Sequence, residues 1–177
     1  IASFSSHGPA LDGRIKPDIT APGNYLTSVQ ARVEGSTGTA CNTAGKSGTS
    51  MSTPVVAGTA GLILQYFQDA KFWAKLCDPQ YTLCKSGAFK PSGVLLKALL
   101  LQSGKAVSGY DGNAAVALSS LPDSYQGFGR VNLASLLPQV AYSKSPFTLF
   151  VHQAQLSELS EHAYTVHVTS SAQPLKV

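Results

Sequence analysis

The sequence is poor in charged residues. Asp, Glu, Lys and Arg together make up only 12% of the 177 residues, and the formal net charge is +4. This share of charged residues is about half of the usual one. The basic residues are spread singly along the chain, whereas a phosphate-binding surface needs them clustered. We therefore expect no nucleic-acid partner.

Long hydrophobic runs are also missing. The longest apolar stretch, residues 55–64, contains Gly and Thr and is much shorter than the roughly 20 residues of a membrane-spanning helix. We expect no membrane span in this segment. Hydrophobic residues nevertheless make up 44% of the chain, which indicates a globular protein with a core rather than a disordered one.

The chain also lacks the usual features of a natural terminus. It opens with IASFSS, with neither Met nor a charged and apolar leader, and it stops at QPLKV in what resembles the first residues of a strand. We expect the 177 residues to be a piece of a longer protein. Whether its ends are processing sites stays open.

Cysteine is scarce, with only Cys41, Cys77 and Cys84 present. The spacing of the last two fits no common zinc motif, in which two residues separate paired cysteines. Asp78 and Pro79 between them favour a turn that brings the thiols together. We predict a disulfide there, and with it an extracellular or secretory location. The alternative is a pair of half-buried free thiols. Cys41 is left over, and a pairing with a residue outside this segment stays open for it.

The order of predicted elements divides the chain into two parts. Residues 1–142 mix short strands with helices, whereas residues 143–177 alternate like antiparallel strands, so we place a domain boundary near Ser143. The predicted elements are strands at 1–6 and 25–29, a loop at 30–46, a helix from about 50 to 67, a second helix within 90–104, a glycine turn and short helix at 126–137, a linker at 138–146, and strands at 147–153 and 162–168.

The first predicted helix is hydrophobic nearly all round. Val55, Thr59, Leu62 and Tyr66 share one helical stripe, and further apolar and small residues flank it. Such a helix is expected to be buried. Pro54 is best tolerated in the first turn of a helix, which places Ser50 at or just before the N-terminus.

Two interpretations of Ser50 compete on the residues alone. A Ser at a helix start is most often a cap, whose oxygen accepts a backbone N–H bond. A cap, however, does not require Gly48 before it or Met51 after it. A nucleophile does benefit from this setting, because Gly48 leaves room for a substrate and the helix N-terminus stabilises negative charge.

The string GTSMSTPVVAG, residues 48–58, resembles the nucleophile motif of the subtilisin-like serine proteases, which usually reads G-T-S-M-A-x-P-x-V-A-G. Similar phrases of this family match FSSHGPALDGRIKPDITAPG, KPSGVLLKALLLQSG and QGFGRVNLASLL, in the right order over residues 1 to about 140. The resemblance implies an α/β fold, the C-terminal part of a parallel-sheet catalytic domain. The segment beyond it resembles the start of an antiparallel β-sandwich domain.

The same resemblance implies a serine endopeptidase in which Ser50 is the nucleophile and its backbone N–H helps to form the oxyanion hole. Gly48 and Thr49 would bind the substrate, which is a protein or peptide. The family needs no cofactor for its chemistry; calcium sites are common in relatives, but no acidic cluster identifies ligands here. The expected partner is the N-terminal part of the same domain.

The departures from the family pattern leave an alternative open. Ser52 stands where Ala is usual, and no Asp or His of this chain sits in the D-T-G, D-S-G or H-G-T-H phrases of the triad. His7 is expected to be a turn histidine, and His162 and His167 should face opposite sides of a strand rather than bind a metal. The chain alone is therefore expected to be inactive. An inactive relative that serves as a binding or scaffold module is the second hypothesis.

Overall fold

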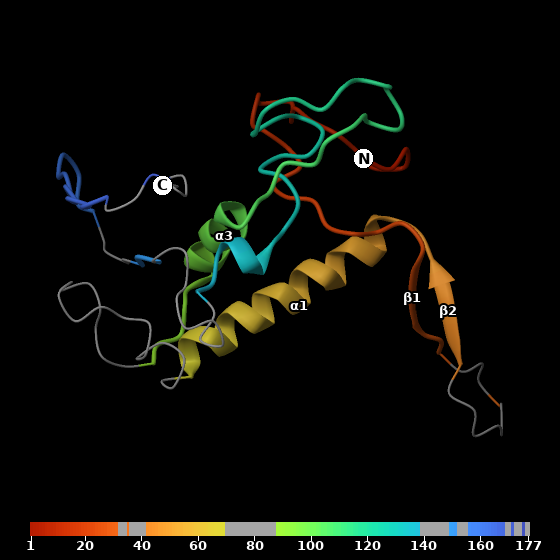
Figure 1. The fold of residues 1–177 in the computed structure, drawn as a ribbon, viewed down its shortest axis with the longest axis horizontal. Helices are drawn as coiled ribbons and strands as arrows, with labels where there is room; N and C mark the ends of the chain where they lie inside the picture. Colours follow the sequence, from red (N-terminus) through yellow and green to blue (C-terminus); the bar gives the residue numbers. More distant parts are fainter. Residues whose placement is uncertain are drawn as a thin grey trace.

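The computed structural model contains two α-helices, a two-stranded sheet and a short 3₁₀ helix among its described residues (Figure 1). The strands are β1, Leu26–Val29, and β2, Thr43–Lys46. The helices are α1, Thr49–Gln68, and α3, Gly93–Gln102, and the 3₁₀ helix η1 spans Leu133–Ser135. The structure describes residues 1–31, 35, 42–69, 88–138, 149–151, 156–168, 171 and 175.

Strands β1 and β2 form an antiparallel pair immediately before α1. Leu26 lies opposite Lys46 and Val29 opposite Thr43. The prediction of a strand near β1 is confirmed, whereas the prediction of an unbroken loop over residues 30–46 is wrong. The TAGK sequence of β2 lacks the alternation of a strand, and its conformation is set by pairing with β1, which no local pattern reveals.

Helix α1 begins at Thr49 and has Gly48 as its N-cap residue. Ser50 is thus at the helix start, as predicted, but Pro54 is the sixth residue and lies in the second turn, not the first. Because proline has no N–H, the Ser50 carbonyl lacks the donor that residue 54 would otherwise supply. This missing bond falls close to the helix end.

Only the C-terminal half of α1 is buried. Ile63, Tyr66 and Phe67 join Leu99 of α3 and the pair Leu136 and Leu137 in the core. Complete burial of a side chain such as Ile63 or Phe67 contributes about 1.5–3 kcal/mol. The Tyr66 hydroxyl donates to the Pro138 carbonyl at 3.2 Å, and burial raises the pKa of Tyr66 to about 12.

The prediction that α1 is buried nearly all round is wrong for its N-terminal half. Figure 1 shows α3 and η1 lying along the C-terminal half, while the N-terminal half runs on towards the hairpin. Exposed residues follow one face of that half at helical spacing: Thr53, Pro54, Ala57, Gly58, Gly61 and Leu62. The apolar and small residues of the sequence indicate that this face of α1 can be buried, but no described residues cover it.

Three backbone segments meet above α1. Residues 18–20 and 127–131 run side by side: the Thr20 N–H donates to the Gly129 carbonyl, and the Val131 N–H donates to the Thr20 carbonyl, both at 2.9 Å. Lys105 and Arg130 exchange two further backbone bonds. The bridge between Thr20 and Arg130 is parallel. Apart from it, the described residues contain no trace of the predicted parallel sheet.

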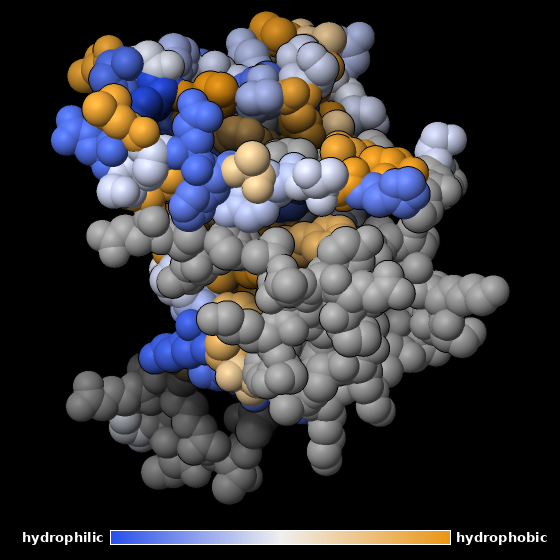
Figure 2. All heavy atoms as spheres, turned by 90° about the vertical axis from the view of Figure 1, so that its left-hand side faces the viewer, coloured by the Kyte–Doolittle hydropathy of each residue, from blue (hydrophilic) through white to orange (hydrophobic). Residues whose placement is uncertain are grey.

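The strands predicted at residues 1–6 and 162–168 are absent from the structure, which describes both segments. Ile1 donates to the Tyr110 carbonyl and accepts from the Gly112 N–H, but among the described residues no ladder of such bonds continues along residues 2–6, and a strand needs one. The boundary near Ser143 and most of residues 147–153 lie outside the described residues, so the β-sandwich stays a prediction. Leu149 and Val151 pack against the core. Figure 2, which views the molecule from the left-hand side of Figure 1, shows hydrophobic residues exposed among hydrophilic ones.

Candidate active site at the start of helix α1

Ser50 is an exposed side chain in the first turn of α1. The N-cap residue is Gly48, and no side chain caps this end of the helix, so Ser50 does not act as a cap. The first N–H groups of an α-helix have no acceptor within the helix, and the Ser50 N–H is one of them. The helix dipole adds partial positive charge at the same place. A hydroxyl and an unused N–H donor therefore stand together at the positive end of α1.

Gly48 forms the sharp turn from β2 into α1. Its φ of 147° and ψ of 164° fall in a region that residues with a Cβ rarely adopt. The Gly48 carbonyl accepts from the Met51 N–H at 3.0 Å and so starts the first helical turn. Thr49 is the first helical residue, and its carbonyl accepts from the Thr53 hydroxyl at 3.0 Å. The structure thus brings the three predicted residues Gly48, Thr49 and Ser50 together.

The turn at Gly48 is attached to the segment that precedes β1. The Gly48 N–H donates to the Gly23 carbonyl at 2.8 Å. Gly23 itself is buried, and a Cβ on it would collide with the Ser52 hydroxyl and lie 2.9 Å from the Gly48 carbonyl. The APG phrase of the sequence therefore packs directly against the beginning of α1.

Ser52, the departure from the family pattern, faces this contact. It is half-buried beside Gly23, whereas Ser50 is exposed. The two residues are two positions apart on the helix, roughly 200° around its axis, so their side chains point in different directions. Replacing the usual Ala by Ser leaves the helix start intact.

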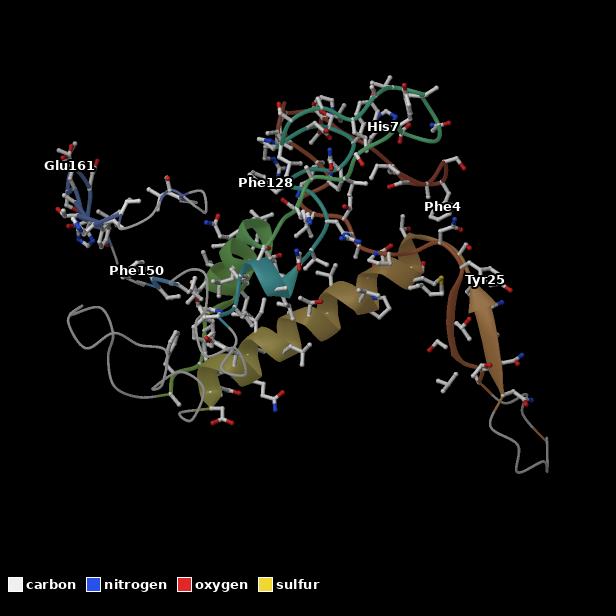
Figure 3. The ribbon with its side chains drawn as sticks, viewed as in Figure 1. Phe4, His7, Tyr25, Phe128, Phe150 and Glu161 are labelled. Atoms are coloured by element: carbon white, nitrogen blue, oxygen red, sulfur yellow. The ribbon has the colours of Figure 1, made fainter. Side chains whose placement is uncertain are left out.

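Tyr25 and Ser47 form a second attachment, which no sequence motif predicts. The Tyr25 N–H donates to the Ser47 hydroxyl oxygen at 2.8 Å. That hydroxyl donates in turn to Asn24 Oδ1 at 3.0 Å. Tyr25 has a φ of 55°, and its ring lies over Gly45, where a Cβ would come within 3.1 Å of it. Figure 3 shows Tyr25 where β1 begins, beside the end of β2 and the start of α1.

The described histidines have other surroundings. His7 is exposed, its Nδ1 lies 3.2 Å from the Gly8 carbonyl oxygen, and its ring centroid is 5.1 Å from that of Tyr125. These contacts agree with a turn histidine. His162 contacts Tyr164 two residues away. Within the described part of the chain, no group of three or more His, Cys, Asp or Glu could hold a metal ion.

Several predicted features cannot be placed. Cys41, Cys77 and Cys84 lie outside the described residues, so the disulfide between the last two stays a prediction. None of the helices that the structure describes combines the length and the apolar character needed to cross a bilayer.

A model of the subtilase family matches residues 1–132, which include β1, β2, α1 and α3 and end directly before η1. The chain belongs to the subtilase family. Its described helices and small sheet are consistent with the α/β fold of a subtilase domain.

Curated relatives of this subtilase chain include two Dictyostelium discoideum proteins. The serine protease/ABC transporter B family protein tagB is 37% identical over 146 residues, 77% of this chain and 7% of the relative. The tagD protein is 38% identical over 117 residues, 62% of this chain and 6% of the relative. The chain therefore spans only a small part of these relatives.

A bacterial relative matches over a shorter stretch. The serine protease AprX of Bacillus subtilis is 43% identical over 75 residues, 39% of this chain and 17% of the relative. No solved structure gives a significant match. Membership of the family and these named relatives support a serine protease function in general terms.

Proposed function

We propose that this chain supplies the nucleophile, Ser50, of a serine endopeptidase whose other catalytic groups belong to a longer protein. The observation that carries the proposal is the position of Ser50. Its side chain is exposed in the first turn of α1, the N-cap residue is Gly48 and not Ser50, and the Ser50 N–H is one of the first N–H groups of the helix, which have no acceptor within it. The subtilase match over residues 1–132 supports it.

The proposed reaction is acyl transfer through a covalent intermediate. A histidine of the longer protein accepts the proton of Ser50 Oγ as this oxygen attacks the substrate carbonyl carbon, and an aspartate orients that histidine. The Ser50 N–H and a side-chain amide of the longer protein hold the developing oxyanion. The histidine then donates the proton to the leaving amine, and water releases the acyl group.

Gly48 and Thr49 have a proposed role in binding the peptide. Gly48 has no side chain to obstruct an extended substrate, and Thr49 is exposed at the mouth of the turn. A protein or peptide substrate fits a nucleophile held on an open turn. The chemistry needs no cofactor, and any calcium would stabilise the fold rather than take part in the reaction.

The exposed face of α1 is evidence that another part of the same domain packs against this helix. Ala57 has only a methyl group, and Gly58 and Gly61 have no side chain, so this exposed surface permits close approach of another backbone. We propose that the N-terminal part of the catalytic domain covers this face. The 177 residues alone should then show no peptidase activity and no sharp cooperative melt.

The proposed location is extracellular or secretory. It depends on the predicted disulfide between Cys77 and Cys84, because disulfides persist in oxidising compartments. The β-sandwich proposed for residues 143–177 would follow the catalytic domain as a separate unit.

The decisive experiment is replacement of Ser50 in the longer protein. Ser50→Ala should lower kcat by about 10⁴- to 10⁶-fold, because the members of a triad act as a unit, and should abolish labelling by a fluorophosphonate probe. Ser52→Ala is the matched control, since it restores the usual family residue and should leave both activity and labelling in place. Folded wild-type protein that never reacts with the probe would instead favour the inactive binding or scaffold module.

A further inference from the structure

The backbone that carries Ser50 is braced by one short segment, residues 23–26. This segment contacts the turn from β2 into α1 at consecutive points: Leu26 pairs with Lys46, the Tyr25 N–H bonds Ser47, and the Gly23 carbonyl accepts from Gly48. The braced residues end two positions before Ser50. The contacts of residues 23–26 therefore set the path of the backbone that leads into Ser50.

Ser47 is the one residue of this turn whose side chain makes two of the bracing bonds. Its hydroxyl accepts from the Tyr25 N–H at 2.8 Å and donates to Asn24 Oδ1 at 3.0 Å. A hydroxyl has one donor and can accept at the same time, so a single Ser serves both contacts. Alanine would remove both at once.

Tyr25 has a backbone conformation that residues with a side chain disfavour, so its surroundings must hold it there. A bulky residue with a φ of 55° occupies a region that side chains disfavour, and it persists only where its surroundings determine it. Here the surroundings are the Ser47 hydroxyl on the Tyr25 N–H and the absence of a side chain at Gly45 beneath the ring. Backbone strain of this kind clusters at functional sites.

We infer that the Ser47 hydroxyl is a positioning group for the nucleophile: bridging Asn24 and Tyr25, it fixes the turn that aims Ser50 and its N–H at the substrate carbonyl. The inference rests on the proposed function. The bonds of the Ser47 hydroxyl go to Asn24 and Tyr25, so its effect on Ser50 passes through the backbone of Gly48 and Thr49. A misplacement of about 1 Å at a reacting group can cost about 100-fold in rate, which makes such a brace kinetically important even where it adds little stability.

The test compares single and double variants in the longer protein. Ser47→Ala should lower kcat about tenfold, with KM unchanged, and slow fluorophosphonate labelling of Ser50 by a similar factor. Ser47→Thr keeps the hydroxyl and should retain most of the rate. Asn24→Ala should produce a comparable loss, and the double variant should be no slower than Ser47→Ala, because the two residues share one bridge.

Active-site titration separates positioning from simple stabilisation. If Ser47 aims the nucleophile, every folded molecule is still labelled, but each reacts more slowly. If Ser47 only stabilises the fold, the labelled fraction falls and the rate per labelled molecule stays constant, which would overturn the inference. Ser28→Ala, an exposed hydroxyl on β1 away from the turn, is the matched control and should change neither quantity.

The outcomes also distinguish this inference from the function on which it rests. If Ser50→Ala abolishes activity but Ser47→Ala keeps the full rate, the proposed function stands and the positioning role of Ser47 is refuted. Losses that multiply in the double variant likewise refute a shared bridge. Wild-type protein that is folded yet unreactive with the probe refutes both.

Discussion

Replacing Gly127 by Ala should test how tightly the three backbone segments above α1 are packed. Gly127 has a φ of 58°, and a Cβ there would come within 2.7 Å of the Asp18 carbonyl oxygen and still closer to that of Pro17. The left-handed conformation costs an Ala about 1 kcal/mol, and forcing an extra carbon into a packed contact costs about 1–3 kcal/mol. We expect the free energy of unfolding to fall by about 2–4 kcal/mol.

A second glycine separates the two contributions. Gly13 has a φ of 82°, yet a Cβ on it would meet no atom within 4 Å, so Gly13→Ala carries only the conformational cost of about 1 kcal/mol. Urea denaturation of both variants in the longer protein, followed by circular dichroism, gives the difference. Equal losses for the two variants would refute the reasoning, because they would mean that the turn at Gly127 can move away from Pro17 at no cost.

Three further predictions concern other parts of the chain. Ser92 caps α3 by accepting from the Leu95 N–H at 3.2 Å, so Ser92→Ala should lower the unfolding free energy by about 1 kcal/mol in the same urea assay. The hydrogen bond from Lys16 holds the pKa of Asp18 below its ordinary value of 3.8, so the carboxylate stabilises the fold above that pH and loses this contribution as the pH falls through its lowered pKa. The stability gap between wild type and Asp18→Asn should therefore be open at pH 7 and close in strong acid. Mass mapping of unreduced protein should show Cys77 and Cys84 joined, and alkylation of both would contradict the disulfide.

The helices were the part of the fold that the sequence could predict. The apolar run after GTSMSTP predicts α1, and the second apolar run after KPSG predicts α3. Both signals are local, since capping residues and helical periodicity lie within one continuous stretch. The position of Ser50 at a helix start followed from the same local information.

The remaining features depend on contacts between distant residues. Strand β2 exists because β1 pairs with it, and its own residues give no such indication. The bond between Ser47 and Tyr25 spans 22 positions, so no motif search would associate them. The exposure of α1 at Gly58 could not be predicted either, because a hydrophobic pattern reports what a helix can bury and not what is present to cover it.

The meeting of residues 18–20, 105 and 127–131 has a consequence for how this region can vary among related sequences. The hydrogen bonds that join its three segments run between main-chain atoms, so exchanging the side chains of Thr20, Lys105 or Arg130 leaves these bonds in place. Insertions and deletions are another matter, since one added residue would shift every donor past its acceptor. We expect homologues to vary in residue type at positions 20, 105 and 130 while keeping the glycines at 127 and 129, where a Cβ would collide with backbone, and the spacing between the three segments.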